Sequence, residues 1–220
     1  MKTLQAVLLM SDESGARLCR LASEIGISLK AEVVGDLPTL TRKFDEPQKL
    51  LLSFGTSVIV PAPLLEQPGL LALNVHAASP DYPGRDPHHF AVYDGATKYG
   101  ATVHFMTSKV DAGPIVDMEL FDVPIDATPA SLLDQANQAA WVLLDRLLKK
   151  LAGDKALAPL AGASWGTRKT TRKMFIELCR VDASMTAVEF ASRLRATSMP
   201  GYSNLYMEVH GHRFRIESKT

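Results

Sequence analysis

The sequence predicts an α/β fold, a mostly parallel sheet flanked by helices, followed by a short C-terminal α+β appendage. Up to residue 155, short apolar segments alternate with segments of helical spacing, as expected for parallel strands joined by helical crossovers. From residue 156 the composition changes to a Pro/Gly/Ala/Ser linker and then a basic stretch. We therefore predict a domain over 1–155, and a linker with a small helix–hairpin subdomain over 156–220.

The N-terminal segments predict strand–helix–strand units. The apolar run over 5–10 predicts a first strand, and 13–25 carries the apolar spacing of a helix that stops at Gly26. The run over 29–34 predicts a second strand. The charged segment 37–49 contains two prolines and predicts a loop or a frayed helix.

The middle of the chain predicts further strands. The β-branched residues over 57–60 predict a strand that Pro61 stops, and 70–75 predicts a buried strand. Two more strands are expected over 100–106 and 115–123. Together these segments complete a sheet.

A long helix and a small appendage follow. Thr128 with Pro129 predicts the start of the helix, whose wide apolar stripe ends at Gly153. We assign this helix to core packing. In the appendage, Thr186 and Glu189 form the pattern of a capping box, and 205–216 predicts a hairpin. The appendage is too short for a sizeable core of its own, so it should pack on the main domain.

Composition limits the classes of function. The 220 residues are 46% hydrophobic and 22% charged, as in an ordinary globular protein. Formal net charge is zero, which argues against nucleic acid as the main partner. No apolar run reaches membrane-spanning length, and Cys19 and Cys179 form no metal or redox motif. We expect a cytoplasmic protein without membrane association, and the sequence is compatible with a homodimer.

Polar residues at one strand end indicate a site. Asn74 and His76 share a face of their strand because side chains alternate with period two, and they lie at its carboxyl end. Ligands bind at that edge of open α/β sheets. An amide and an imidazole can polarise a carbonyl and move a proton. The pattern equally allows both side chains to bond loop backbone groups.

Asp111 follows the strand over 100–106 and could orient His76 or accept a proton. The alternative is an Asx-turn, in which the carboxylate bonds its own backbone. Thr102 and His104 share one face of that strand, directed at the site or into the core.

Metal and phosphate motifs are missing from the sequence. The pairs His88/His89 and His210/His212 have no companion ligands at metal-binding spacing, so we interpret them as solvated loop histidines and expect no metal. The sequence contains neither a Gly-x-Gly-x-x-Gly motif nor a Walker loop, both of which bind phosphate. The turn between the first strand and the first helix is acidic, which does not suit phosphate binding.

The region 73–115 resembles the 10-formyltetrahydrofolate-dependent formyltransferase family. The match is specific because several spaced elements occur in order, and it covers about residues 50–150. These elements are Leu73-Asn74-Val75-His76, Tyr82-Pro83-Gly84-Arg85-Asp86-Pro87, Phe90-Ala91-Val92-Tyr93, Tyr99-Gly100-Ala101-Thr102-Val103-His104-Phe105-Met106 and Val110-Asp111-Ala112-Gly113-Pro114-Ile115.

The resemblance implies a Rossmann-like fold and a site for formyl transfer without a metal. Asn74, His76 and Asp111 match the catalytic trio of the family. Thr102 and His104 match the strand beside the site, as substrate contacts. The co-substrate implied is 10-formyltetrahydrofolate. Its pterin would be held by apolar residues and by a closing loop, namely Ser57, Val58, Ile59, Val60 and Leu65, and Thr107 and Val110.

The resemblance also implies a primary amine as acceptor, and we expect a nucleotide-linked amino sugar that contacts Tyr82, Gly84 and Arg85. The tail is shorter than the C-terminal barrel of methionyl-tRNA enzymes, which favours a small acceptor. An aminoacyl group, on tRNA or as a carrier-protein thioester, is the alternative, and a degenerate folate-binding module is another. The loop over 77–87 departs from the His-Pro-Ser pattern of most members, so the acceptor side is where this chain differs.

Overall fold

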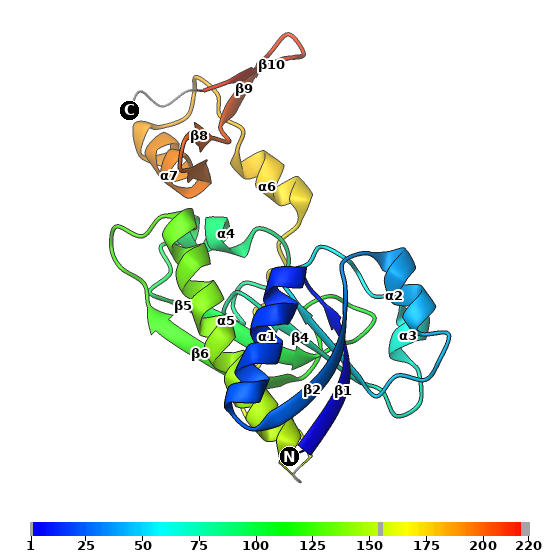
Figure 1. Ribbon diagram of the computed structural model, residues 1–220. Helices are drawn as coiled ribbons and strands as arrows, with labels where there is room; N and C mark the ends of the chain where they lie inside the picture. The colour runs from blue at the N-terminus through cyan, green and yellow to red at the C-terminus, as the bar shows by residue number, and fades with distance from the viewer. Residues whose placement is uncertain (1, 154–155, 217–220) are drawn as a thin grey trace.

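The computed structural model describes residues 2–153 and 156–216 and contains a six-stranded sheet with the strand order β2-β1-β3-β4-β5-β6 (Figure 1). The first four strands pair in parallel, and β5 and β6 run antiparallel to their neighbours. The predicted α/β class is therefore confirmed. The strands of this sheet are β1 (Lys2–Leu9), β2 (Ile27–Val34), β3 (Leu50–Phe54), β4 (Leu71–His76), β5 (Lys98–Phe105) and β6 (Ile115–Asp122).

In the described part of the chain, five helices accompany the main sheet and two belong to the appendage. The N-caps of α1 and α5 are Ser11 and Thr128, whose side chains accept backbone N–H groups of the first turn. The helices are α1 (Asp12–Glu24), α2 (Leu37–Lys43), α3 (Ala62–Leu65), α4 (Pro87–Asp94), α5 (Pro129–Ala152), α6 (Arg172–Leu178) and α7 (Ala187–Thr197).

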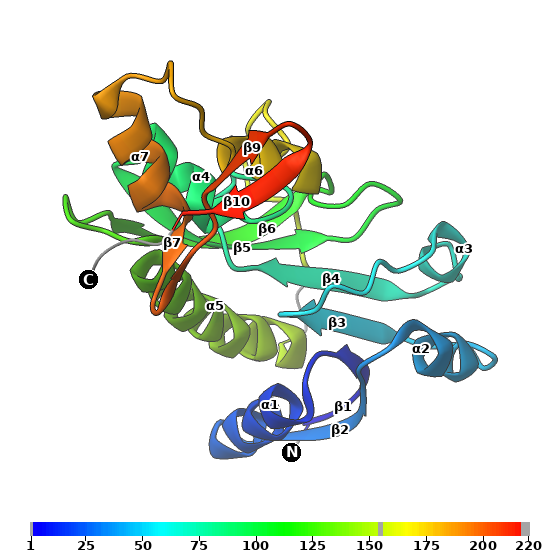
Figure 2. The same ribbon diagram turned by 90° about the horizontal axis from the view of Figure 1, so that it is seen from above.

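The sheet has an apolar core on each face. Seen from above, α1 and α5 lie on the same side of the sheet (Figure 2), where Leu18 and Leu143 pack against strand residues such as Leu73. On the opposite face, Leu40 of α2 packs with Ala72 of β4. Since side chains alternate along β4, Asn74 and His76 lie on the same face as Ala72.

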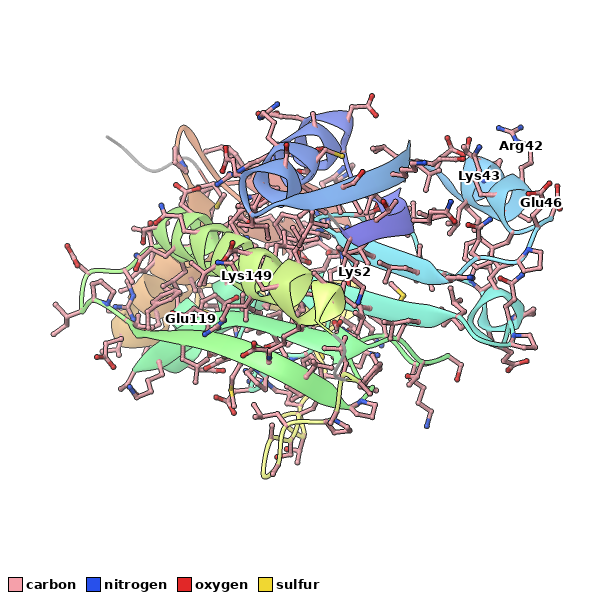
Figure 3. The ribbon with its side chains drawn as sticks, turned by 60° about the horizontal axis from the view of Figure 1, so that its bottom comes forward. Lys2, Arg42, Lys43, Glu46, Glu119 and Lys149 are labelled. Carbon is pink, nitrogen blue, oxygen red and sulfur yellow. The ribbon has the colours of Figure 1, made fainter. Side chains whose placement is uncertain are left out.

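The outer surfaces of α5 and β6 carry charged side chains, among them Lys149 and Glu119 (Figure 3). Arg146 of α5 donates to Glu119 of β6 at 2.8 Å, and Lys149 pairs with Asp145 one turn earlier. Exposed pairs of this kind contribute little to stability. The apolar stripe of α5 therefore carries the packing, as expected from the sequence.

The appendage packs on the main domain, as its length predicted. Phe175 of α6 and Ala196 of α7 share an apolar cluster with Phe90 of α4 and Tyr99 of β5. The imidazole of His89 donates from Nδ1 to the carbonyl of Ala196 at 2.6 Å. The two parts therefore share one core. The domain boundary predicted at 155 lies outside the described residues.

The predicted hairpin is present in the appendage. Strands β9 (Tyr206–Val209) and β10 (His212–Arg215) pair antiparallel around His210-Gly211. Both turn residues have positive φ, 49° and 76°, which suits a two-residue hairpin turn. A second small pair joins β7 (Ser198–Met199) to β8 (Tyr202–Ser203).

One prediction about local structure is wrong, and two are met only in part. The strand expected over 57–60 does not form, because β3 ends at Phe54 and Gly55 takes φ +63°. The segment expected as loop or frayed helix contains α2, which Asp36 caps through the backbone N–H of Thr39. The capping box of α7 is half formed. The hydroxyl of Thr186 accepts the N–H of Glu189, whose carboxylate instead accepts from Tyr93 and Arg193.

A search of the described residues found no helix long and apolar enough to cross a membrane.

Candidate active site

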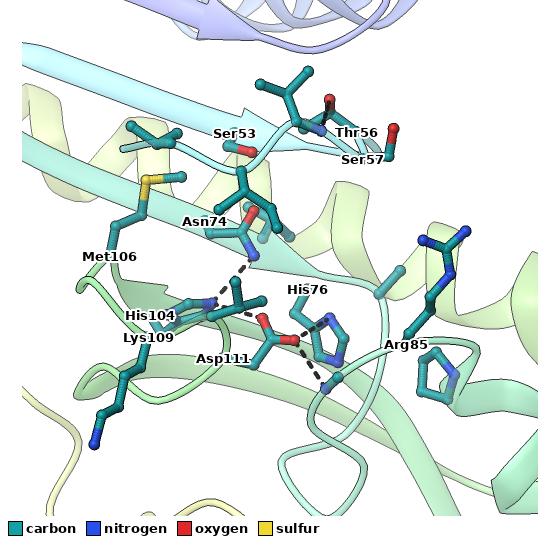
Figure 4. A pocket seen from close by; sticks show the side chains of 18 of the residues that line it. Ser53, Thr56, Ser57, Asn74, His76, Arg85, His104, Met106, Lys109 and Asp111 are labelled. Atoms are coloured by element: carbon teal, nitrogen blue, oxygen red, sulfur yellow. Dashed lines mark hydrogen bonds and ion pairs between the residues drawn. The ribbon is translucent and has the colours of Figure 1, made fainter. Parts of the chain in front are cut away.

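Strands β4 and β5 place the first two polar groups side by side. In the antiparallel register, Asn74 lies opposite His104. Nδ2 of Asn74 lies 3.1 Å from Nε2 of His104 (Figure 4). Nδ1 of His104 lies 2.8 Å from the carbonyl of Phe105, and a carbonyl can only accept. Nδ1 therefore carries a hydrogen, and Nε2 is left to accept the amide of Asn74 when it is unprotonated.

The orientation of His76 is also set by a backbone carbonyl. Its Nε2 lies 3.1 Å from the carbonyl of Tyr82, so this nitrogen is a donor. Nδ1 then carries the lone pair in the uncharged ring, and it lies 3.7 Å from Oδ2 of Asp111. The sequence allows Asp111 either to orient His76 or to accept a proton. The ring is held by Tyr82 instead, with the carboxylate beyond hydrogen-bond distance.

Asp111 lies between the two imidazoles. Its Oδ1 is 3.4 Å from Nε2 of His104, and its Oδ2 accepts the backbone N–H of Gly84 at 2.9 Å. None of these contacts is an Asx-turn, so the carboxylate faces distant segments rather than its own backbone. The residue has φ +45°, an uncommon conformation for a non-glycine residue that occurs at functional sites.

The surroundings of Asp111 favour its ionised form. Burial raises the pKa of this carboxyl, but the contact with His104, the charge of His76 and the Gly84 N–H outweigh burial and lower it. With only 5% of the residue exposed, the carboxylate depends on these partners.

These groups line a cavity of about 560 Å³ at the carboxyl end of β4. One lobe, here called the donor lobe, is formed by the segment after β3, by α3 and by the loop after β5, and its apolar side chains alternate with hydroxyl groups. The structure brings together every residue that the sequence predicted for cofactor binding. The donor lobe comprises Ser57, Val58, Ile59, Val60, Leu65, Met106, Thr107 and Val110.

The other side of the cavity, here called the acceptor side, is formed by the segment 84–88 with Ala77 and Leu133. Gly84 and Arg85 line it as predicted. Asp86 and His88 line it as well and were not predicted. Asp86 occupies the N-cap position before α4 with φ +56°, and its side chain makes no capping hydrogen bond.

Two predicted substrate contacts do not reach the cavity. Thr102 is fully buried and donates its hydroxyl to the carbonyl of Ala78 at 2.8 Å. Tyr82 is 9% exposed, and its ring packs against Tyr99 with centroids 5.9 Å apart. Burial raises the pKa of Tyr82 to about 12. Thr102 and Tyr99 of β5 thus hold the loop over 77–87 through Ala78 and Tyr82, and neither Thr102 nor Tyr82 is available for direct contact with a substrate.

The histidines His88 and His89 are also placed differently from the prediction of solvated loops. Both lie in α4, and burial together with the neighbouring His89 lowers the pKa of His88 to about 3. His89 is buried against Phe175. His210 and His212 are exposed in the hairpin. Within 2–153 and 156–216, no group of three or more His, Cys, Asp or Glu side chains is arranged to hold a metal ion.

Sequence reasoning missed a clamp formed by the segment 165–170. Trp165 donates its indole N–H to the carbonyl of Gly113 at 2.7 Å, beside the Asp111 turn. Thr170 and Arg85 pair through their backbones, and Lys169 donates to the carbonyl of Val110. Part of the basic stretch that follows the linker therefore borders the cavity. No local sequence pattern predicts these contacts, because each joins residues more than fifty positions apart in the chain.

Comparison with known proteins gives the family. Residues 42–147 match the family model described as formyl transferase, and this region contains Asn74, His76, His104 and Asp111. The chain carries a formyl transferase domain. The expected resemblance to this family is confirmed.

Curated relatives of this formyl transferase domain are methionyl-tRNA formyltransferases. The protein of Listeria monocytogenes is 34% identical over 112 residues, which are 50% of this chain and 36% of the relative. The protein of Herminiimonas arsenicoxydans is 31% identical over 154 residues, 68% of this chain and 47% of the relative. The sequence match thus spans less than half the length of these relatives.

Solved structures extend the likeness of fold to nearly the whole chain. A 4-N formyltransferase from Francisella tularensis superposes with a TM-score of 0.76 at 18% identity, and a sugar N-formyltransferase from a Shewanella species with 0.77 at 16%. Each match covers 99% of this chain and 97% of the other. HypX from Aquifex aeolicus, solved with tetrahydrofolic acid, superposes with 0.67 at 19% identity over 97% of this chain and 37% of its own.

Proposed function

We propose that this chain transfers a formyl group from 10-formyltetrahydrofolate to the primary amine of a small acceptor. One observation carries the proposal. The cavity joins an apolar lobe to a polar base where Asn74, His104 and Asp111 interact and His76 lies beside them. The lobe suits a flat bicyclic ring, and the polar base suits a reacting carbonyl.

The donor lobe suits a pterin in its chemistry. Val58, Leu65 and Met106 offer apolar surface, and loop backbone groups beside them can pair with ring nitrogens. The volume lies within the range of sites for molecules of this size. HypX, a neighbour in fold, was solved with tetrahydrofolic acid, which supports a folate as donor.

Asn74 is placed to stabilise the negative charge that develops on the formyl oxygen. One hydrogen of its amide is directed at His104, which leaves the second free for the cavity. A preoriented donor of this type is worth on the order of 3 kcal/mol of barrier. The bond from the acceptor nitrogen to the formyl carbon forms, and the bond from that carbon to N10 of the folate breaks.

The proton of the attacking amine has a defined route. Nδ1 of His76 can accept it, because Nε2 is engaged by the carbonyl of Tyr82. The resulting imidazolium would then face Oδ2 of Asp111 at 3.7 Å, which stabilises the positive charge. N10 of the departing tetrahydrofolate receives the proton in the end.

We propose a nucleotide-linked amino sugar as the acceptor. Sugar N-formyltransferases match this chain in fold over nearly the full length of both chains. The zero net charge disfavours a tRNA, and Arg85 on the acceptor side offers a cation for a phosphate. An aminoacyl group on tRNA or on a carrier protein is the second candidate, favoured by the named activity of the curated relatives. We place the protein in the cytoplasm, where folate co-substrates of one-carbon metabolism occur and thiols such as Cys19 and Cys179 stay reduced.

The test is an assay of the purified chain with 10-formyltetrahydrofolate and a panel of acceptors. The panel contains nucleotide-linked amino sugars, aminoacyl carrier proteins and methionyl-tRNA, and release of tetrahydrofolate is followed by absorbance. Turnover with an amino sugar, lowered about a hundredfold in Asn74→Ala, is expected. Turnover with methionyl-tRNA, steeply dependent on salt, would support the alternative instead. Folate binding without turnover on any acceptor would indicate a degenerate binding module.

A further inference from the structure

Trp165 lies against both histidines of the site. Its ring centroid is 5.0 Å from that of His104, with an interplanar angle of 88°, and 6.0 Å from that of His76, at 61°. Both are edge-to-face contacts, which favour one relative orientation of the rings. The indole therefore packs against the two imidazoles, each of which has one nitrogen directed at Asp111.

The polar end of the same side chain fixes the turn that carries Asp111. The indole N–H donates to the carbonyl of Gly113 at 2.7 Å, two residues after the carboxylate. The backbone of Gly113 is packed closely against that of Phe105, because a Cβ at Gly113 would lie 1.8 Å from the carbonyl oxygen of Phe105. One side chain thus holds the imidazoles with its ring and the carboxylate turn with its N–H.

The segment around Trp165 is itself anchored at both ends. Gly166 donates its backbone N–H to the carbonyl of Pro80, and a Cβ at this glycine would lie 2.5 Å from the carbonyl oxygen of Asp81. At the other end, the N–H of Thr170 bonds the carbonyl of Pro83 and its own carbonyl accepts from Arg85. These hydrogen bonds fix the backbone on the C-terminal side of Trp165, and they thereby hold the indole against the site.

We propose that Trp165, which lies outside the matched region 42–147, is a positioning residue that sets the geometry of His76, His104 and Asp111. This inference rests on the proposed function for its kinetic consequence only. Displacing reacting groups by about an ångström costs about a hundredfold in rate. The expected effect is therefore on kcat, because the side chain does not line the donor lobe.

The experiment compares two substitutions of the same type. The chain has two tryptophans, and Trp141 packs against Phe54 and Arg17 on the face covered by α1 and α5. Trp165→Phe keeps a ring but loses the N–H, Trp165→Leu loses both, and Trp141→Phe is the matched control. We expect kcat to fall about tenfold in Trp165→Phe and about a hundredfold in Trp165→Leu, with KM for the folate unchanged within about twofold. Trp141→Phe should keep the wild-type kcat.

A second readout does not depend on activity. Long-range ¹H–¹⁵N spectra of imidazoles distinguish the nitrogen that carries hydrogen. In the wild type and in Trp141→Phe, His76 should carry hydrogen on Nε2 and His104 on Nδ1, as their carbonyl partners require. Trp165→Leu should show mixed tautomers for both rings. Unchanged tautomers together with an unchanged kcat in a folded Trp165→Leu protein would overturn the proposal. If the wild type transfers no formyl group, the proposed function fails while the spectra still decide the role of Trp165.

Discussion

Oδ1 of Asp111 lies 3.4 Å from Nε2 of His104, and both side chains are almost completely shielded from solvent. The same ring nitrogen lies 3.1 Å from the amide of Asn74. Nε2 can therefore accept from Asn74 when unprotonated and donate to Asp111 when protonated. Through this shared nitrogen, the ionisation of the Asp111 carboxylate is coupled to the orientation of the Asn74 amide. That amide is expected to bind the formyl oxygen.

Replacing Asp111 by Asn should lower kcat by on the order of a hundredfold or more, because the carboxylate no longer stabilises a protonated His76. Its effect on stability should depend on pH. The pKa of Asp111 is lowered in the folded state, so the ionised form stabilises the fold above the ordinary carboxyl pKa, and this contribution disappears as pH falls through the lowered value.

Urea unfolding measures this directly. Asp111→Asn should be less stable than the wild type at neutral pH, and the difference should shrink in acid. Asp45→Asn, at an exposed carboxylate of a loop, is the control and should show neither effect. A constant difference at all pH values would contradict the assigned partners of Asp111.

Replacing Asn74 by Ala should lower kcat about a hundredfold, the typical cost of one oxyanion donor. The side chain lies at the base of the cavity, so KM for the folate should change little. Steady-state kinetics with both substrates varied give kcat and KM for the folate separately. Asn137→Ala on α5 removes an amide outside the cavity and should be silent, whereas equal losses in both variants would point to a general defect of folding.

The sequence predicted the polar strand end because the rule behind it is local. Alternation with period two places Asn74 and His76 on one face whatever the rest of the fold does. Asp111 was found through the family resemblance, since a lone acidic residue in a turn carries no signal of its distant partners.

Other parts of the site depend on contacts that no local pattern encodes. Trp165 follows a linker without periodicity, and its partners lie fifty residues or more before it. Thr102 was placed on the correct face of its strand, but a strand pattern does not tell which neighbour will cover that face, and here the carbonyl of Ala78 does. For the same reason the β-branched run after Gly55 lines a cavity instead of pairing as a strand.

Replacing His88 by Gln should flatten the loss of stability in acid. Burial and the neighbouring His89 lower the pKa of His88 to about 3, far below an ordinary histidine. The folded protein thus resists protonation that the unfolded chain accepts, so stability falls as pH drops from about 6.5 to about 3. Thermal unfolding over this range should show a shallower slope in His88→Gln. His212→Gln, at an exposed position of β10, should keep the wild-type slope.

Replacing Gly84 by Ala tests the contact between the acceptor side and the clamp. Gly84 has φ +104°, and a Cβ would lie 2.2 Å from the backbone oxygen of Thr170. The strained conformation and the overlap together should cost about 3 kcal/mol. Because the N–H of Gly84 donates to Oδ2 of Asp111, the displaced loop should also lower kcat.

Gly69→Ala separates the two causes, since this glycine has φ +78° but open space around a Cβ. It should cost only the conformational part, about 1–2 kcal/mol, and leave kcat unchanged. The excess loss in Gly84→Ala then measures how firmly Thr170 holds the acceptor side. Equal stability and equal kcat in the two variants would mean that this contact does not constrain the loop in solution. The clamp would then have to act through Trp165 alone, on the Asp111 turn.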